Sequence, residues 1–178
     1  MIFQSEKPII QIAYTVKDVR QAAQIWSNKF NIGPFYVNEH IPLTNSYVRG
    51  VPEPFDHSSA YGWQENLMIE LICDHAQKIS PIAISPDKLF GGIHHVAWIA
   101  PDFEAECHAL ENQDCVQVLS AQNGGDTGMK LAWFDPQNGM NHFYEIYEDT
   151  DDIRQFYTFL SGKAKNWDGR NPIRDMSD

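Results

Sequence analysis

The feature that most constrains this chain is an internal repeat. Residues 11–18 (QIAYTVKD) and residues 95–102 (HVAWIAPD) begin 84 positions apart, and both have alanine in third place and aspartate in eighth. Other positions match in type, with aromatic or β-branched residues in both copies, and each copy leads into a helical pattern. A period of this length is too long for a stacked solenoid repeat, so the pattern predicts a duplicated supersecondary module.

Each copy of the repeat is followed by the same order of elements. Residues 9–16 and 93–100 are rich in β-branched and aromatic residues, which predicts a strand at the start of each half. Asp18 and Asp102 stand where a helix N-cap belongs, and apolar residues at helical spacing follow both. Turn-rich segments then separate three predicted strands in each half: 35–41, 46–51 and 66–72 in the first, and 116–121, 129–134 and 142–147 in the second. The chain is therefore predicted to be an α+β protein with tandem βαβββ modules.

The pattern divides the chain into three predicted parts. They are an N-terminal module with its linker over residues 1–84, a C-terminal module over residues 85–150, and an extension over residues 151–178. The linker is expected at residues 75–91, where prolines and glycines interrupt the strand pattern.

The extension is predicted to begin with a helix. Ile153, Phe156, Tyr157 and Leu160 have the spacing of one helical face, which predicts an amphipathic helix over residues 151–162 that packs on the body. The remaining residues are polar and predict no further element. Trp167 is the one candidate anchor among them.

The composition excludes several classes of function. The 178 residues are 43% hydrophobic, which is enough for one well-buried core. The formal net charge is −11 and basic residues do not cluster, so nucleic acid and membrane-surface partners are not expected. No apolar run reaches the roughly 20 residues of a membrane-spanning helix, and the first residues lack the layout of a signal peptide. Three cysteines without CxxC spacing predict free thiols in a cytoplasmic protein, and the expected partner is a small molecule.

Four polar residues stand at equivalent places in the predicted strands of the two halves. Because successive side chains of a strand alternate between faces, Gln11 and His95 fall on equivalent faces of equivalent strands. The strand MIEL aligns with the strand FYEI, so Glu70 and Glu145 also recur. An unpaired buried carboxylate is costly, whereas two carboxylates, an imidazole and a carboxamide oxygen suffice for a divalent cation. We therefore predict that these four side chains bind one metal ion.

Each of these residues has an ordinary structural explanation when taken alone. A strand glutamate often points to water or pairs with a basic residue, and a strand histidine is more often a hydrogen-bonded core residue than a ligand. The recurrence favours the metal, because a random surface carboxylate would not repeat in register. His94 is expected to face away from the ion that His95 binds. The other histidines lack partners at ligand spacing: His40, His57, His75, His108 and His142.

The order and spacing of these motifs resemble the vicinal oxygen chelate superfamily, which includes glyoxalase I, methylmalonyl-CoA epimerase, extradiol dioxygenases and bleomycin-resistance proteins. The resemblance covers about residues 8–148. It implies paired modules whose strands form a curled mixed sheet around a cleft with one divalent metal, and it implies a homodimer. The segments that carry it are QIAYTVKD (11–18), FNIGPFY (30–36), MIEL (68–71), HHVAWIAPD (94–102) and AWFDP (132–136), which leads to Glu145.

The resemblance also implies a ligand set. The ligand positions of the superfamily fall on Gln11, Glu70, His95 and Glu145, and zinc, nickel or cobalt is the expected ion. This set is similar to that of eukaryotic-type glyoxalase I. Extradiol dioxygenases hold iron with two histidines and one glutamate, so Gln11 counts against oxygen chemistry. The stretch before Glu145 departs from the usual glyoxalase sequence, and no arginine cluster indicates a glutathione site.

The expected activity is that of a glyoxalase-like lyase, isomerase or epimerase acting next to a carbonyl of a small metabolite. The cation, as a Lewis acid, would lower the pKa of the adjacent C–H group, and Glu145 or Glu70 would act as general base, with family position favouring Glu145. Aromatic residues expected near the cleft are Phe143, Tyr147 and Trp63. The alternatives are a non-catalytic, drug-sequestering type of binding module and, with less support, an extradiol-type dioxygenase.

Overall fold

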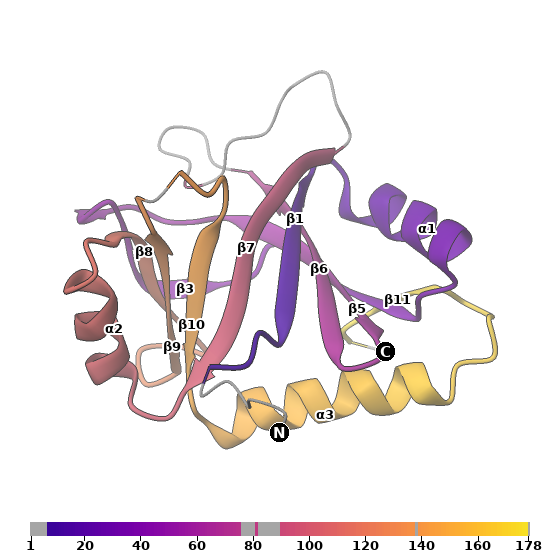
Figure 1. Cartoon of the computed structure of the whole chain (residues 1–178). Coiled ribbons are helices and arrows are strands. Elements are labelled where there is room, and N and C mark those ends of the chain that lie inside the picture. The colour runs from indigo at the N-terminus through magenta and orange to yellow at the C-terminus, as the bar shows by residue number, and fades with distance from the viewer. Residues whose placement is uncertain (1–6, 76–80, 82–89, 138, 178) are drawn as a thin grey trace.

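The computed structural model describes residues 7–75, 81, 90–137 and 139–177, and within them the chain forms three helices and one sheet of eleven strands (Figure 1). In chain order the elements are β1 (Gln11–Val16), α1 (Val19–Phe30), β2 (Phe35–Asn38), β3 (Leu43–Val48), β4 (Val51–Pro52), β5 (His57–Gln64), β6 (Leu67–Asp74), β7 (Phe90–Ala100), α2 (Phe103–Glu111), β8 (Val116–Asn123), β9 (Met129–Asp135), β10 (Phe143–Glu148), α3 (Asp151–Lys165) and β11 (Ile173–Asp175). The predicted α+β class is confirmed.

The sheet has the internal symmetry that the repeat predicts. Its strand order is β11-β2-β5-β6-β1-β7-β10-β9-β8-β3-β4. The two repeat strands, β1 and β7, are antiparallel neighbours at the centre. β6 runs parallel to β1 on one side, and β10 runs parallel to β7 on the other. The four central strands therefore come from the two copies of the repeat and lie next to one another.

The first half departs from the predicted pattern in two places. Strand β5 was not predicted, although it pairs with β6 along its whole length. Its sequence, HSSAYGWQ, is small and polar at the start and carries Gly62, so it lacks the alternation of large apolar residues by which a strand is recognised. The segment predicted as a strand at residues 46–51 falls in β3 and β4, and β3 pairs with β8 of the other half.

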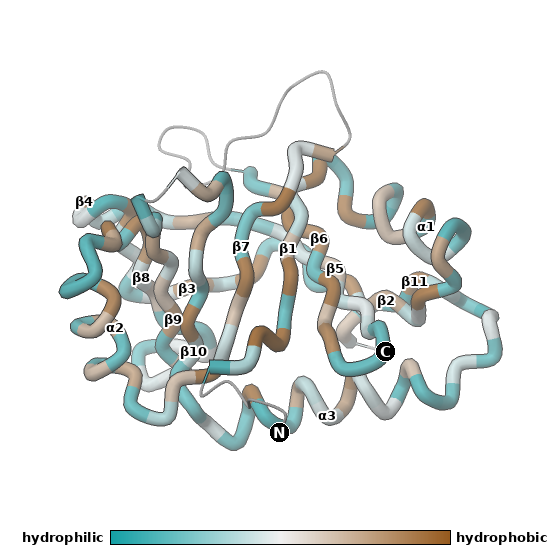
Figure 2. The backbone as a smooth tube through the Cα atoms, in the orientation of Figure 1, coloured by the Kyte–Doolittle hydropathy of each residue, from teal (hydrophilic) through white to brown (hydrophobic). Residues whose placement is uncertain are grey.

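The helices cover both faces of the sheet. Asp18 and Asp102 cap α1 and α2, since each side chain accepts a hydrogen bond from a backbone N–H in the first turn. The apolar stripes of α1 and α2 pack into two clusters on one face of the sheet. Helix α3 buries Ile153, Tyr157 and Leu160 in a third cluster, which contains Ala13 and Ala97 from the centre of the sheet. The central strands carry long hydrophobic stretches, whereas much of α3 is hydrophilic (Figure 2).

The C-terminal residues form an element that the sequence did not predict. After α3 the chain turns back, and β11 pairs in parallel with β2 at the edge of the sheet. Trp167 anchors this return, because its indole ring packs so closely on Gly33 that a Cβ there would lie 2.9 Å from the ring. The polar composition of this segment hid the strand, whose partner lies far away in the sequence.

Most of the predicted linker, residues 76–80 and 82–89, lies outside the described residues, and Phe90 and Gly91 belong to β7. The division of the chain into modules at residue 84 stays a prediction. Cys73, Cys107 and Cys115 are free, as predicted, and all three are buried. Among the described helices, none has the length and apolar character needed to cross a membrane.

The packing of β5 generates a stability prediction. A Cβ on Gly62 would lie 2.5 Å from the ring of Phe35, which is fully buried. We expect Gly62→Ala to lower the free energy of unfolding by about 1–3 kcal/mol, because the core must shift to admit the methyl group. The matched control is Gly162→Ala in α3, where a Cβ meets open space. This variant should raise the free energy of unfolding by about 1 kcal/mol or less, because alanine favours the helix more than glycine does. Urea denaturation measures both variants, and equal effects would contradict the prediction.

Candidate functional site

The four predicted ligands come from the four central strands of the sheet. Gln11 lies on β1, Glu70 on β6, His95 on β7 and Glu145 on β10. The registers are equivalent in the two halves. Ala13 pairs with Glu70, and Ala97 pairs with Glu145. Between the two central strands, β1 and β7, Ala13 lies opposite His95 and Gln11 lies opposite Ala97. Because paired residues point to the same face of a sheet, all four polar side chains project from one face.

The four side chains meet at their polar ends. The Nε2 atom of Gln11 lies 2.5 Å from Oε2 of Glu70, 3.0 Å from Nε2 of His95 and 3.3 Å from Oε2 of Glu145. The Nε2 atom of His95 lies 2.7 Å from Oε2 of Glu145 and 3.2 Å from Oε2 of Glu70. All four residues are almost completely buried, with at most 3% of their surface exposed. One chain therefore supplies the whole group.

The carboxamide of Gln11 is positioned from its other side by α3. The hydroxyl of Tyr157 donates a hydrogen bond of 2.6 Å to Oε1 of Gln11, and burial, reinforced by Glu145 and Glu70, raises the pKa of Tyr157 well above 10. The Nε2 atom has two hydrogens but four close neighbours, which include the hydroxyl of Tyr147 at 3.2 Å. The oxygen and nitrogen of a carboxamide are interchangeable by rotation. With a cation between the acids, a turned carboxamide would direct its oxygen to that cation, and its N–H would donate to the hydroxyl oxygen of Tyr157.

A second histidine sets the orientation of His95. The Nδ1 atoms of His94 and His95 lie 2.7 Å apart. Burial lowers the pKa of His94 well below 6.5, so this ring is neutral and its Nδ1 accepts the Nδ1–H of His95. The Nε2 atom of His95 is thereby directed at the two carboxylates. Histidines that bind metals usually donate their other ring N–H to a neighbouring acceptor, which fixes the direction of the ligating nitrogen.

The two acids and His95 form a strongly coupled group. Burial by itself would lower the pKa of His95, but Glu145 and Glu70 outweigh it and raise the pKa to about 10. Burial by itself would raise the pKa of Glu70, but its hydrogen bond and charge interaction with His95, together with the hydroxyl of Ser59, lower it. In the absence of another cation, a proton on His95 therefore offsets part of the negative charge of the two acids.

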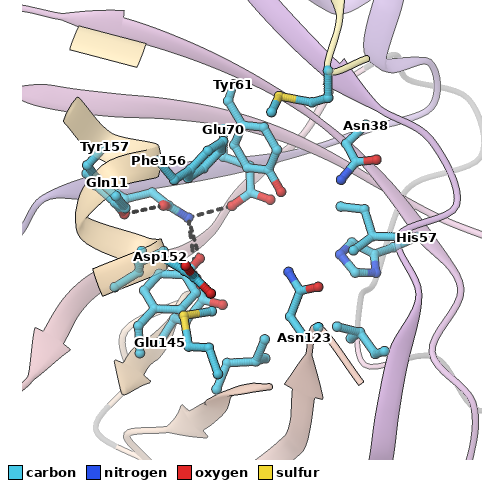
Figure 3. Close-up of a pocket in the computed structure, with 18 of the residues that line it drawn as sticks. Gln11, Asn38, His57, Tyr61, Glu70, Asn123, Glu145, Asp152, Phe156 and Tyr157 are labelled. Carbon is cyan, nitrogen blue, oxygen red and sulfur yellow. Dashed lines mark hydrogen bonds between the residues drawn. The ribbon is translucent and has the colours of Figure 1, made fainter. Parts of the chain in front are cut away.

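A cavity of about 300 Å³ opens beside this group. Gln11, Glu70 and Glu145 line one side of it, and Figure 3 shows their polar ends together with Tyr157 from α3. Apolar side chains from both halves of the sheet and from α3 form much of the remaining wall: Ile41, Leu43, Met129, Leu131, Trp133 and Phe156. The polar group is thus accessible to a small molecule from the cavity.

Sequence reasoning found the four central residues but not the residues that support them. Tyr147 lines the cavity as expected, whereas Phe143 and Trp63 are not among the described residues that line it. Ser59, whose hydroxyl donates to Oε1 of Glu70 at 2.6 Å, lies on the unpredicted strand β5. Tyr157 was recognised only as part of an apolar stripe. The one signal in the sequence was the hydroxyl of this tyrosine, because a residue that only packs in the core could equally be leucine.

Comparison with known proteins identifies the family. The family model described as the Glyoxalase/Bleomycin resistance protein/Dioxygenase superfamily matches residues 10–133, which is more than half of the chain. The chain belongs to this superfamily. The resemblance seen in the sequence motifs is confirmed, and none of the curated proteins compared matches the sequence.

Solved structures with the fold of this superfamily superimpose at low sequence identity. Methylmalonyl-CoA epimerase from Mycobacterium tuberculosis gives a TM-score of 0.51 at 15% identity and covers 87% of this chain and 97% of its own. A hypothetical protein from Bacillus halodurans C-125 gives 0.52 at 14% identity over 83% and 97%. A methylmalonyl-CoA epimerase in complex with methylmalonyl-CoA and NH4+ gives 0.52 at 12% over 83% and 97%. At these identities the likeness shows the shared fold.

In this member of the superfamily the four side chains fit a divalent cation. Ligand atoms about 2.1 Å from one cation lie about 3 Å from one another. The Nε2 atom of His95 lies 3.2 Å from Oε2 of Glu70 and 2.7 Å from Oε2 of Glu145, which is close to this spacing. Carboxylate, imidazole and carboxamide donors suit zinc, nickel and cobalt. A second group, His40, Asp56 and His75, also brings three ligand atoms within 4.8 Å, but His40 and Asp56 are exposed and no cavity adjoins the group among the described pockets.

The raised pKa of His95 predicts a pH dependence for the metal-free protein. Protonated His95 stabilises the fold fully below its ordinary pKa of 6.5, and the contribution is lost as the pH rises toward the folded-state pKa of about 10. We expect the free energy of unfolding of chelator-treated protein to fall between pH 6.5 and pH 9 relative to that of His95→Gln, which lacks the group. Urea denaturation across this range measures the difference. Parallel curves for the two proteins would contradict the assignment.

Proposed function

We propose that this protein is a metal-dependent enzyme of the lyase or isomerase and epimerase type that moves a proton next to a carbonyl of a small molecule. The observation that carries the proposal is the buried group Gln11, Glu70, His95 and Glu145 beside a cavity. A methylmalonyl-CoA epimerase of the same fold has been solved with methylmalonyl-CoA bound, which supports a small-molecule substrate. A homodimer and a cytoplasmic location stay predictions.

The cation would be held by these four residues. When bound, it supplies Lewis acidity that makes the C–H next to a coordinated carbonyl more acidic. The two carboxylates neutralise a 2+ charge, and Gln11 and His95 add no charge of their own in the ligand state. Apolar residues around the cavity, such as Leu131 and Ile153, exclude water. The dry surroundings strengthen every electrostatic interaction at the site.

Glu145 is the better candidate for the base. Both oxygens of Glu70 are engaged, Oε1 by Ser59 and Oε2 by Gln11 and His95. In Glu145 the contacts with Gln11 and His95 use Oε2, and among the described residues Oε1 has no hydrogen-bond partner. Glu145 also lines the cavity. Its free oxygen is therefore placed to take a proton from a substrate and to return it.

Metal binding is the first test. We expect protein stripped with a chelator and dialysed against zinc, nickel or cobalt to retain one ion per chain, measured by atomic absorption. Glu70→Ala should lose the ion, because the remaining buried acid and His95 form an incomplete set. Asp56→Ala in the exposed histidine group is the matched control and should keep it. Ligand binding with no bound ion would instead fit the non-catalytic module.

Proton transfer is the second test. The probes are phenacyl alcohol, a neutral hydroxyketone, and methylmalonyl-CoA, incubated with metal-loaded protein in D2O. We expect deuterium to enter next to the carbonyl of at least one probe, followed by NMR. Glu145→Gln should slow this exchange by about 100-fold or more, the usual contribution of a general base.

The matched control is Glu148→Gln, which changes another acid of β10. The side chain of Glu148 accepts a hydrogen bond from the backbone N–H of Lys130 and is not among the residues that line the cavity. It should exchange at the rate of the unchanged protein. Absence of exchange with both probes would contradict the proposed reaction, and undiminished exchange in Glu145→Gln would remove this residue from the role of base.

A further inference from the structure

The cavity has a second polar wall, which faces the four central residues. Asn38 at the end of β2, His57 at the start of β5 and Asn123 at the end of β8 all line the cavity. Figure 3 shows their polar ends gathered on one side of the open space, with Glu70 and Glu145 on the other side. The two walls lie on opposite sides of the cavity, so a molecule that enters the cavity would contact both.

One polar atom of this second wall is buried without a hydrogen-bond partner among the described residues. His57 is 7% exposed, its ring stacks on Phe55 with centroids 4.5 Å apart, and its Nδ1 atom is buried without a hydrogen-bond partner among the described residues. Asn38 is half-buried and Asn123 is exposed, so their side-chain amides are open to the cavity and to water. A buried polar atom without a partner costs free energy. The unpaired Nδ1 atom of His57 is explained when a ligand supplies the missing partner.

The charge around the cavity selects the kind of group that can be bound. No lysine or arginine is among the described residues that line the cavity, whereas Glu70, Glu145 and Asp152 are. Burial lowers the pKa of His57 and outweighs the opposing effect of Glu70, so the imidazole is neutral near pH 7. The neutral imidazole offers one hydrogen-bond donor and one acceptor, and each asparagine amide also offers donors and an acceptor. At this wall an anionic group would find no lysine or arginine to pair with, whereas an uncharged hydroxyl, phenol or amide finds complementary partners.

The middle of the cavity is apolar and limited in size. Ile41, Leu43 and Met129 are among its lining residues, together with aromatic rings. A volume of about 300 Å³ is at the lower end of the range for ligand pockets. The space therefore suits a compact molecule with a hydrophobic body and a polar group at each end.

We propose that Asn38, His57 and Asn123 form a substrate-binding wall for an uncharged hydrogen-bonding group, and that the substrate class is a neutral hydroxyketone with an apolar body. This inference rests on the proposed function, because the vicinal oxygens at the other end of the molecule would bind the cation that Gln11, Glu70, His95 and Glu145 are proposed to hold. It excludes phosphorylated, CoA-linked and glutathione-linked molecules as the preferred substrates.

Three matched probes test the inference: phenacyl alcohol, its para-hydroxy derivative and its para-carboxy derivative. Their binding to metal-loaded protein is measured by calorimetry. We expect the para-hydroxy derivative to bind about three- to tenfold more tightly than phenacyl alcohol, which corresponds to one added hydrogen bond. The para-carboxy derivative should bind more weakly than phenacyl alcohol. Equal affinities for all three probes, or tightest binding of the carboxylate, would overturn the inference.

Two variants test whether the wall residues cause the preference for the para-hydroxy derivative. His57→Phe retains an aromatic ring against Phe55 but removes both nitrogens, so the preference for the para-hydroxy derivative should disappear. Asn123→Lys places a cation at the wall and should make the para-carboxy derivative the preferred probe. His108→Phe, at an exposed position on α2, is the matched control and should keep the original order of affinities. Retention of that order in both wall variants would overturn the role of these residues.

The outcomes separate this inference from the proposed function. If metal-loaded protein exchanges the proton of methylmalonyl-CoA while none of the three aromatic probes binds, proton transfer stands and the neutral substrate class is wrong. If no ion is retained, the proposed metal dependence is wrong. If Glu145→Gln exchanges protons as fast as the unchanged protein, Glu145 is not the base. If the para-hydroxy derivative is both preferred and exchanged, both proposals are supported.

Discussion

The structure depends on the burial of two carboxylates at the centre of one sheet. Glu70 and Glu145 are each 3% exposed, and both lie within 3.3 Å of the same atoms of Gln11 and His95. Two buried negative charges are too costly to leave without a compensating cation. A proton on His95 offsets one of these charges, and a divalent metal would offset both. The competition between these two cations links the stability of the fold to its proposed chemistry.

The geometry of the sheet brings these charges together. Because β1 and β7 are antiparallel neighbours, the two copies of the repeat are related by an approximate two-fold rotation that superimposes Gln11 on His95 and Glu70 on Glu145. Ala13 and Ala97, identical in the repeat and fully buried, leave space on this face beside the two acids. Helix α3 then completes the site from outside the symmetric part, since Tyr157 holds the amide of Gln11. The duplicated part positions the ligands, and the extension orients one of them.

Sequence patterns predicted the parts of the fold in which local periodicity is strong. The caps Asp18 and Asp102, the apolar stripe of α3 and the strands that carry Glu70 and Glu145 were all recognisable. Strand β5 was missed because Ser59 and its neighbours are small and polar, although they are buried between other strands. The pairing of β3 with β8 and of β11 with β2 was also missed. Edge pairings of this kind depend on distant partners, which leave no periodic signal.

The sequence by itself determined that the chain is built on a duplicated βαβββ pattern and that an amide, an imidazole and two acids occupy equivalent strand positions in its halves. Repetition in register made this visible, because side-chain direction in a strand follows from position alone. Only the tertiary structure decided that the four meet within a single chain, that Tyr157, 146 positions from Gln11, supports them, and that His57 and two asparagines face them across a cavity. These relations depend on how the sheet curls and on where α3 packs, and both are set by contacts between residues distant in sequence.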